Sequence, residues 1–569
     1  MKLFHRTFTR RARKASAHEI LPEDVFLDSQ NISKLNLDQM EGQLERPLGR
    51  NVFYGAIIVI TILISSFSYR LFSMQIVNGE AYTVKADRNH LKTTPLFALR
   101  GTISDRNGVL LAWNTIGTST AIDEIPKRAY ITEGGFSHVL GYVSYPKKDQ
   151  SGIFWQESYI GKDGLEKEYQ DTLQGVPGER VIAINALHQI EAENVNIDPS
   201  NGENIKLTID KGVQAKLYER MEALSAKAGF TSGAGVIMDI HSGEILAITS
   251  YPQYNNNLMT NAKTKEENAQ VSKDLLDKRR TFLDRAVSGL FTPGSTVKPF
   301  VALAALMEGV ITPEKNIYSS GQLVVKNKYG GPDTVFKDWK AHGYTDMRKA
   351  LAESSDEYFY QVGGGFQGQP GLGIDRINTY AKLFGFGTTT GIDLPAEEYG
   401  VVPNPAWKKK VFNEDWLVGD TYHTSIGQYG FQLTPLELVR AVAALANGGQ
   451  LVRPHVLAGA ATSSIAISLP EKDLNVIREG MHMVVHAENG TGRALDIAGV
   501  DIAAKSGTAE LGVSKQFVNS LITGYFPYEN PKYAFVVVME KGDRHNLYGS
   551  VFAARETFEW MRDNTSYMK

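Results

Sequence analysis

The chain of 569 residues contains no cysteine. Disulfide bonds, thiolate nucleophiles and cysteine-ligated zinc or iron–sulfur sites are therefore excluded, and cysteine usage leaves the redox compartment undetermined. The net charge is only −3, so no overall basic character points to nucleic acid as a partner. Internal repeats and low-complexity tracts are also absent. The apolar content of 42% is typical of a globular protein, and the length predicts more than one domain.

Long hydrophobic runs are also lacking, with one exception near the N-terminus. Residues 51–69, NVFYGAIIVITILISSFSY, carry no charge and lie between Arg50 and Arg70. About 20 apolar residues span a bilayer as a helix. A cleaved signal peptide fits poorly because a long polar segment comes first and no clear cleavage site follows. A buried core helix is the other alternative, but the run has no polar stripe. We predict a transmembrane helix.

Basic residues upstream of this run set the expected orientation. They are Lys2, Arg6, Arg10, Arg11, Arg13, Lys14, Arg46 and Arg50. The positive-inside rule then keeps the N-terminus in the cytoplasm. We predict a single-pass protein of the cytoplasmic membrane, in which residues 1–50 form a largely disordered tail and everything after Arg70 lies outside the membrane.

Residues 70–204 are predicted to form an elongated domain next to the membrane. The segment 71–94 favours a helical continuation away from the bilayer. Residues 100–114, RGTISDRNGVLLAWN, place an Asn-Gly turn between two apolar runs, which predicts a β-hairpin. In residues 161–180, glycines surround a short amphipathic helix.

The pattern changes at about residue 205, where a second domain, residues 205–569, is predicted to begin. Asp210 is placed to cap a long helix, and residues 234–252 read as a hairpin. Helices follow to about residue 380, and the chain ends with a buried strand, Tyr533–Lys541, and a terminal helix, Phe552–Arg562. Strands at both ends of a helical middle predict an α+β domain whose sheet joins distant segments.

The first candidate catalytic motif is FTPGSTVKPF, residues 291–300. In the first turn of a helix, Ser295 and Lys298 share a face. A serine hydroxyl is a weak nucleophile until a base takes its proton, and a lysine can be that base when burial lowers its pKa. The spacing alone is weak evidence, because Ser144 and Lys147 repeat it around a proline in what reads as a loop.

Two further motifs follow in order along the chain. Ser354-Ser355-Asp356 comes after an apparent helix that begins near Thr345. Lys505-Ser506-Gly507, followed by Thr508, lies on an apolar, strand-like run, and no other K-[S/T]-G occurs in the sequence. The ordered triple S-x-x-K, S-x-D and K-S-G is far more specific than any one of its members.

This ordered triple resembles the signature of penicillin-binding proteins and serine β-lactamases. RGTISDRNGVLLA and GKDGLEKEYQDTLQGVPG are similar to pedestal motifs of the class B penicillin-binding proteins, and DRAVSGLFTPGSTVKP is similar to a block of their transpeptidase domain. The resemblance covers roughly residues 51–560. FKDWKAHGYTDMRKALAESSDEYFYQVG most resembles the elongation type, often called penicillin-binding protein 2.

The resemblance implies a fold and a reaction. The fold would be an antiparallel sheet flanked by helices, carried on a pedestal and a single membrane helix. The reaction would be peptidoglycan D,D-transpeptidation through a serine acyl-enzyme in cell-wall synthesis, with stem peptides as substrates, β-lactams as inhibitors and a polytopic glycosyltransferase as a partner. A D,D-carboxypeptidase or β-lactamase, and a β-lactam sensor or non-catalytic scaffold, remain as alternatives.

Residue roles carried over from the resemblance are as follows. Ser295 would be the nucleophile and Lys298 its base. Ser354 would relay protons to the leaving amine, and Asp356 would hold that network. Lys505 would supply positive charge. Ser506, Gly507 and Thr508 would bind the substrate, with the hydroxyls of Ser506 and Thr508 on its terminal carboxylate. The backbone N–H groups of Ser295 and Thr508 would form the oxyanion hole.

The sequence departs from the family pattern at several positions. Asp356 stands where Asn is usual, and Ser506 replaces the usual threonine but keeps its hydroxyl. Some elongation-type relatives hold a structural zinc with Asp, His and Cys in the region of Asp333, Asp338 and His342. The matching Cys position would be Ser355, and a hydroxyl is a poor zinc ligand. We predict no metal and no cofactor.

Overall fold

The structure is a computed structural model that describes residues 49–115, 125–150, 154–184, 190–327, 330–512 and 515–568. The predicted cytoplasmic tail therefore lies almost wholly outside the described residues. The chain divides into two compact units, Met1–His90 and Leu91–Lys569.

The first unit consists, in its described part, of two helices joined by a π-helical turn. Helix α1 spans Arg50–Phe72, the turn spans Ser73–Val77, and α2 spans Gly79–His90. None of the side chains of α1 is buried. The 28 residues Arg50–Val77 are long and apolar enough to cross a bilayer, so this helix fits a single-pass membrane anchor.

The helical continuation predicted for residues 71–94 is wrong at its C-terminal end. Strand β1, Leu91–Leu96, begins directly after α2. Thr93 and Thr94 are β-branched, and Pro95 disfavours the helical conformation in the residue before it. These three residues explain why the helix does not extend past His90.

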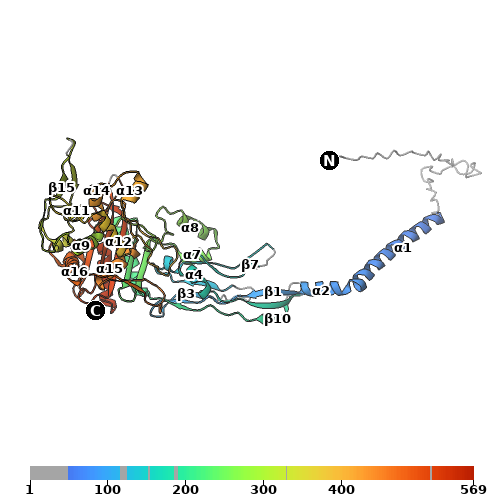
Figure 1. Cartoon of the computed structure of the whole chain (residues 1–569). Helices are drawn as coiled ribbons and strands as arrows, with labels where there is room; N and C mark the ends of the chain where they lie inside the picture. The colour runs from blue at the N-terminus through green and yellow to red at the C-terminus, as the bar shows by residue number, and fades with distance from the viewer. Residues whose placement is uncertain are drawn as a thin grey trace, which may run out of the picture. The chain divides into compact units, whose positions relative to one another are not determined.

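The second unit begins with two small sheets. One has the order β1-β9-β10, with β9 at Gly178–Ile184 and β10 at Ile190–Ile197 (Figure 1). The other has the order β11-β2-β3-β4, with β11 parallel to β2 and the remaining pairs antiparallel. Its strands are β2 (Ile103–Ser104), β3 (Leu110–Thr115), β4 (Lys127–Tyr130) and β11 (Ile205–Lys206).

The predicted hairpin at residues 100–114 is confirmed by β2 and β3. Its turn is closed by Asp105, whose Oδ1 accepts hydrogen bonds from the backbone N–H groups of Asn107 and Val109, both at 2.8 Å. The helix expected within residues 161–180 is split into α4, Gly164–Glu168, and α5, Gln170–Leu173. Other short elements here are α3 (Ser137–Leu140), β5 (Val143–Ser144), β6 (Lys147–Lys148), β7 (Phe154–Gln156) and β8 (Ile160–Gly161).

A five-stranded antiparallel sheet organises the rest of the unit, in the order β13-β12-β22-β21-β20. This sheet joins distant segments, as the sequence predicts. Its strands are β12 (Ser232–Asp239), β13 (Ile245–Tyr251), β20 (Ala503–Leu511), β21 (Phe517–Phe526) and β22 (Tyr533–Asp543).

Both faces of this sheet are covered by helices. Phe535 and Val537 of β22 belong to the core shared with α6, Lys211–Ala228, and α17, Ser550–Asn564. The intervening Val536 and Val538 belong to the opposite core, which contains α15, Pro435–Ala446. Because successive side chains of a strand point to opposite faces, coverage on both sides requires the unbroken apolar run of β22.

Helices and short β-ladders make up the region between the sheet strands. The predicted cap is confirmed, since Asp210 Oδ1 accepts from Gly212 N at 2.9 Å at the start of α6. The helical middle contains two small ladders that the sequence did not predict, β14–β17 and β15–β16. The remaining bounds are as follows: α7 Asn256–Asn261, α8 Lys265–Leu275, α9 Lys298–Met307, β14 Ile317–Ser319, β15 Gln322–Val325, β16 Thr334–Lys337, β17 Gly343–Thr345, α10 Met347–Ala352, α11 Asp356–Gly364, α12 Ile374–Leu383, α13 Pro405–Phe412, α14 Val418–Ser425, β18 Gln450–Val452, β19 Ser464–Ala466 and α16 Glu471–His486.

A buried charge cluster fixes the N-terminal part of the second unit. Glu166 accepts from Nε of both Arg100 and Arg128, and the three side chains are 0% exposed. Arg100 also donates to the Glu166 carbonyl at 2.7 Å and to Gln170 Oε1 at 3.0 Å. One carboxylate therefore balances two guanidinium groups that have no access to water.

Replacing Glu166 by Gln leaves both guanidinium groups without a counter-charge. Breaking a buried pair in this way costs about 3–5 kcal/mol, so we expect E166Q to lower the urea midpoint of the detergent-solubilised chain markedly. Glu168 is exposed two residues away and supplies the control, since E168Q should leave the midpoint unchanged. Equal midpoints for the two variants would contradict the balancing role of Glu166.

Candidate active site

The three predicted motifs meet where α9, the α10–α11 turn and β20 come together. Ser295 lies in a 3₁₀ turn, Gly294–Val297, which runs directly into α9. Ser354 lies in the turn between α10 and α11, and Lys505 lies on β20. Pro299 sits in the first turn of α9, where its missing N–H costs no hydrogen bond.

Four of the predicted residues form one hydrogen-bonded network. Lys298 Nζ donates to Asp356 Oδ1 at 2.6 Å and to the Ser354 carbonyl at 2.7 Å, and it lies 3.3 Å from Ser354 Oγ. Lys505 Nζ donates to the same Ser354 Oγ at 2.9 Å. Ser354 Oγ is therefore the atom through which the two lysines are connected.

The two lysines of this network are buried, and burial changes the pKa of Lys505. Both lysine residues are 0% exposed, whereas the Asp356 side chain is 22% exposed. Burial lowers the pKa of Lys505 well below its ordinary value, the nearby Lys298 lowers it further, and Asp356 opposes the change. Lys298 Nζ also lies 5.4 Å from the centre of the Phe359 ring.

Ser354 adopts a backbone conformation that side chains rarely take, with φ of +59°. This left-handed geometry ends α10 just before α11 begins, and Ser355 caps α11 by accepting from Tyr358 N at 3.3 Å. Strained residues of this kind cost of order 1–3 kcal/mol and persist where the surroundings hold them. Here the hydrogen bonds from Lys298 and Lys505 hold Ser354 in this conformation, with its hydroxyl between the two lysines.

Ser295 stands beside the network without joining it. Its side chain is half-buried, and within the described residues no hydrogen bond links Ser295 Oγ to Lys298 Nζ. The donors of Lys298 are instead directed at Ser354 and Asp356. Contacts between a nucleophile and its base often tighten only when substrate is bound, so the spacing remains compatible with the predicted pair.

Strand β20 places the K-S-G motif beside the turn that carries Ser295. A Cβ atom on Gly507 would lie 2.7 Å from Thr296 Cγ2 and 2.8 Å from the Pro293 carbonyl, so only glycine fits at this contact. Ser506 Oγ donates to Thr491 Oγ1 at 2.7 Å. The side chain of Thr508 is exposed, and its carbonyl lies 3.4 Å from Gln428 Nε2.

Thr491 is a neighbour of the site that sequence reasoning missed. It follows Gly490 in a loop after α16, and its backbone N–H donates to the Ala352 carbonyl at 3.1 Å. It therefore connects the turn that holds Ser354 to Ser506 on β20. No motif spacing pointed to it, because the contact depends on the packing of α16 against β20.

Asp333, Asp338 and His342 lie where some relatives hold a structural zinc, but here these residues have other partners. Asp333 pairs with Lys326 at 2.7 Å, away from the others. His342 Nε2 lies 3.4 Å from Asp338 Oδ1, and its Nδ1 lies 2.9 Å from Glu353 Oε2. Ser355 supplies a hydroxyl that donates to Asp338 Oδ2 at 2.9 Å in place of a thiolate ligand. This donor set does not fit tetrahedral zinc.

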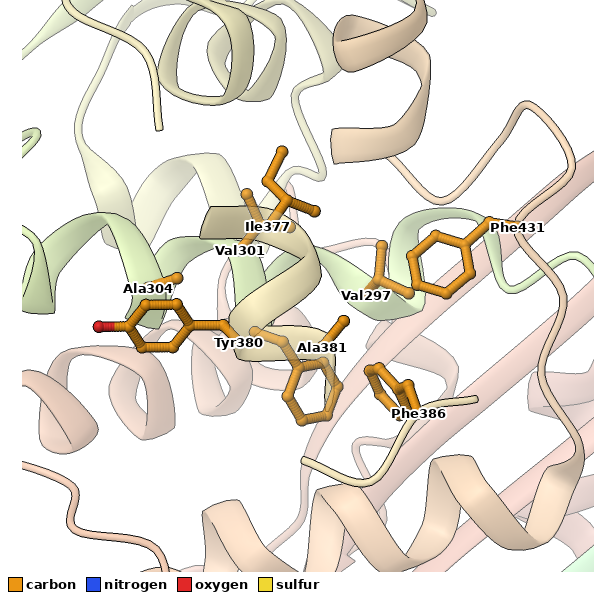
Figure 2. A pocket seen from close by; sticks show the side chains of 9 residues that line it. Val297, Val301, Ala304, Ile377, Tyr380, Ala381, Phe386 and Phe431 are labelled. Atoms are coloured by element: carbon orange, nitrogen blue, oxygen red, sulfur yellow. The ribbon is translucent and has the colours of Figure 1, made fainter. Parts of the chain in front are cut away.

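An apolar crevice lies between α9 and α12, apart from these groups. Figure 2 shows Val301 and Ala304 of α9 beside Ile377 and Tyr380 of α12, and Val297 beside Phe431. Its volume of about 10 Å³ leaves room for a single water molecule at most. None of the predicted site residues lines it, so we assign it to packing between α9 and α12.

Comparisons with known families identify the domains that the chain contains. The family model of the penicillin-binding protein transpeptidase domain matches residues 233–559, and that of the penicillin-binding protein dimerisation domain matches residues 117–207. The peptidoglycan D,D-transpeptidase MrdA of Haemophilus influenzae is 30% identical over 86% of this chain and 87% of its own length.

Solved structures give the same result. PBP2 of Pseudomonas aeruginosa, in complex with WCK 5153, is 30% identical, with a TM-score of 0.65 over 84% of this chain and 98% of its own. PBP2 of Helicobacter pylori, in a complex with MreC, is 28% identical, with a TM-score of 0.68 over 83% and 99% of the two chains. The chain belongs to the class B penicillin-binding proteins, and within them to the elongation type.

The contact between Gly294 and β20 can be tested directly. Gly294 has φ of +53°, and a Cβ atom there would lie 2.7 Å from the Thr508 carbonyl oxygen. We expect G294A to push Ser295 away from β20 and to slow labelling by a fluorescent penicillin by about 100-fold, the scale of a 1 Å misplacement. Labelling is followed by gel fluorescence.

Gly309 provides the matched control for this substitution. Its φ of +63° is as unusual as that of Gly294, but no atom lies within 4 Å of its Cβ position. G309A therefore carries the same backbone strain without the clash at β20. If G309A slows labelling as much as G294A does, strain and not the contact with Thr508 controls the site.

Proposed function

We propose that this chain is a membrane-anchored D,D-transpeptidase that cross-links the stem peptides of peptidoglycan. Its membership of a family whose relatives carry that name supports the reaction class. The observation that carries the residue assignment is the single hydroxyl of Ser354 held between Lys298 and Lys505, beside the helix start that presents Ser295.

The first half of the reaction forms an acyl-enzyme. Lys298, in its uncharged form, takes the proton of Ser295 Oγ as this oxygen attacks the carbonyl of the penultimate D-Ala. The backbone N–H groups of Ser295 and Thr508 stabilise the oxyanion that results. The peptide bond then breaks, Ser354 relays a proton to the departing amine, and D-Ala leaves.

The second half transfers the acyl group. An amine of a neighbouring stem peptide attacks the ester carbonyl, its proton passes to the same network, and Ser295 is regenerated. Asp356 holds Lys298 in position through the contact of 2.6 Å. Lys505, Ser506, Gly507 and Thr508 form the wall that receives the terminal carboxylate of the substrate, and the motif needs no metal or cofactor in these roles.

The domain layout proposed for this activity has four parts. Residues 1–50 form a cytoplasmic tail, 51–69 the transmembrane helix, 70–204 the pedestal and 205–569 the transpeptidase domain. The basic residues before the span favour an N-terminus in the cytoplasm and a catalytic domain outside the cytoplasmic membrane. The substrate would be nascent glycan, and a polytopic glycosyltransferase would supply it.

The nucleophile assignment predicts one covalent labelling site. Incubating the detergent-solubilised chain with a fluorescent penicillin should give a stable label that S295A abolishes, because Ser295 is the serine assigned as the nucleophile. Ser144 begins the second S-x-x-K and ends strand β5, so S144A is the control that keeps the label. The readout is in-gel fluorescence with peptide mapping.

Other outcomes of this experiment favour the alternatives. Rapid loss of the label would indicate a β-lactamase, and absence of any label would indicate a scaffold. With glycan strands that carry pentapeptides, release of D-Ala without cross-linked dimers would indicate a carboxypeptidase. Cross-linked dimers that disappear in S295A support the transpeptidase.

The depressed pKa of Lys505 predicts the pH dependence of acylation. A lysine carries charge below its pKa, so attraction for the carboxylate of penicillin is lost as the pH rises through the lowered pKa of Lys505. We expect an alkaline limb in the acylation rate well below the ordinary lysine range. The measurement is the second-order acylation rate from neutral to alkaline pH.

The K505A variant tests the origin of that limb. Its acylation should be slow at every pH, and the alkaline limb should disappear. K515A is the control, because Lys515 is exposed and pairs with Glu510. An alkaline limb that stays at the same pH in K505A would show that another group controls it.

A further inference from the structure

A second cluster of titratable side chains lies outside the candidate active site. His482 and His486 are four residues apart on α16, so they share one face of the helix. Asp501 lies just before β20 and meets them. Its Oδ1 is 2.8 Å from His482 Nε2 and 3.3 Å from His486 Nε2, and the three ligand atoms all lie within 4.8 Å of one another.

The charge pattern around His486 does not balance without a cation. Its Nε2 faces Asp501, and its Nδ1 lies 3.3 Å from Oδ1 of a second carboxylate, Asp496. A neutral imidazole has one N–H and one lone pair, so it can donate to only one of the two carboxylates. The other nitrogen would then direct its lone pair at an anionic oxygen, which a proton or a metal ion on that nitrogen would relieve.

Several contacts hold these groups in place. The ring of Tyr528 stacks on His482 with centroids 4.2 Å apart, and its backbone N–H donates to the Asp501 carbonyl at 3.0 Å. The loop that carries Asp496 is tied to α17 by Arg555, which donates to the Ala494 carbonyl at 2.9 Å. The cluster is therefore preorganised by groups that are not themselves ligands.

We propose that His482, His486 and Asp501 bind a divalent transition-metal ion of the zinc class. Two imidazoles and a carboxylate are ligands that Zn²⁺ accepts, and a fourth position would be left for water. Ligand atoms about 2.0–2.1 Å from a tetrahedral zinc are about 3.3 Å apart, which is the distance between His486 Nε2 and Asp501 Oδ1. The distance from His482 needs to open by only about 0.5 Å.

Asp496 acts as a positioning residue in this site. By accepting from Nδ1–H of His486, it sets the tautomer that leaves Nε2 free to bind the metal. The site is open to exchange, because the side chains of His482, His486 and Asp501 are 30%, 27% and 43% exposed. It is also distinct from the buried Asp338–His342 pair.

A bound ion would connect the C-terminal end of α16 to the start of β20. Asp501 lies four residues before Lys505, and Thr491, between α16 and β20, donates to the turn that holds Ser354. The ion would therefore brace the strand that carries the K-S-G motif without contacting the reacting atoms. We expect Zn²⁺ to raise the unfolding temperature and to leave penicillin labelling by Ser295 unchanged.

The test uses the full chain in detergent, stripped with chelator and then titrated with Zn²⁺ by equilibrium dialysis. We expect one Zn²⁺ per chain, and its loss in the H482Q/H486Q double variant. D496N should weaken binding by about 10–100-fold without removing the tetrahedral absorption bands of a Co²⁺-substituted sample. Penicillin labelling of each variant reports that it is folded, and D501N offers a single substitution should the double variant fail to fold.

Two controls make the assignment specific. His545 is exposed on a loop, and H545Q should bind Zn²⁺ as the parent does. H342Q tests the buried pair and should also bind normally. No Zn²⁺ on the stripped parent chain, parent-like affinity in H482Q/H486Q and D501N, or loss of binding in H342Q alone would each overturn the proposal. Because labelling by Ser295 is read separately, failure of the metal site and failure of the proposed enzyme activity are distinguishable.

Discussion

The site depends on two buried lysines that share one hydroxyl. Lys298 and Lys505 both contact Ser354 Oγ, yet only one carboxylate, Asp356, is close enough to pair with either of them within the described network. At 4 Å, two like charges repel by about 4 kcal/mol even at an effective dielectric constant of 20. Burial and the nearby Lys298 therefore make Lys505 release its proton more easily than an ordinary lysine. Such an arrangement suits a reaction in which protons are taken and returned.

The surrounding fold buries the two lysines and holds the segments that carry them in place. α9 is buried along almost its whole length, and α16 packs against both α10 and β20. The turn at Gly294 and the strand at Gly507 approach so closely that neither position has room for a methyl group. The nucleophile and the K-S-G strand are thus placed by backbone contact, which varies less than contact between flexible side chains.

Much of the fold could be predicted from the sequence because it depends on local patterns. The apolar span, the hairpin at Asp105, the cap at Asp210 and the strand β22 all follow from spacing within a short window. The end of α2 was predicted wrongly, because β-branched residues before Pro95 outweighed the helical pattern. The two small ladders and the contact between Thr491 and Ser506 join segments that no local pattern relates. The roles of the site residues rest on the resemblance and on geometry that the motif spacing alone does not contain.

The order of the sheet has a consequence for how the protein is made. β22 is the last strand of the chain, yet it lies at the centre of the sheet, between β12 and β21. A chain that has emerged only as far as β21 would hold Ser295, Ser354 and Lys505 but would lack the strand that joins the two halves of the sheet. Long-range pairing of this kind forms late in folding. A chain that ends at β21 therefore cannot complete the five-stranded sheet to which the K-S-G strand belongs.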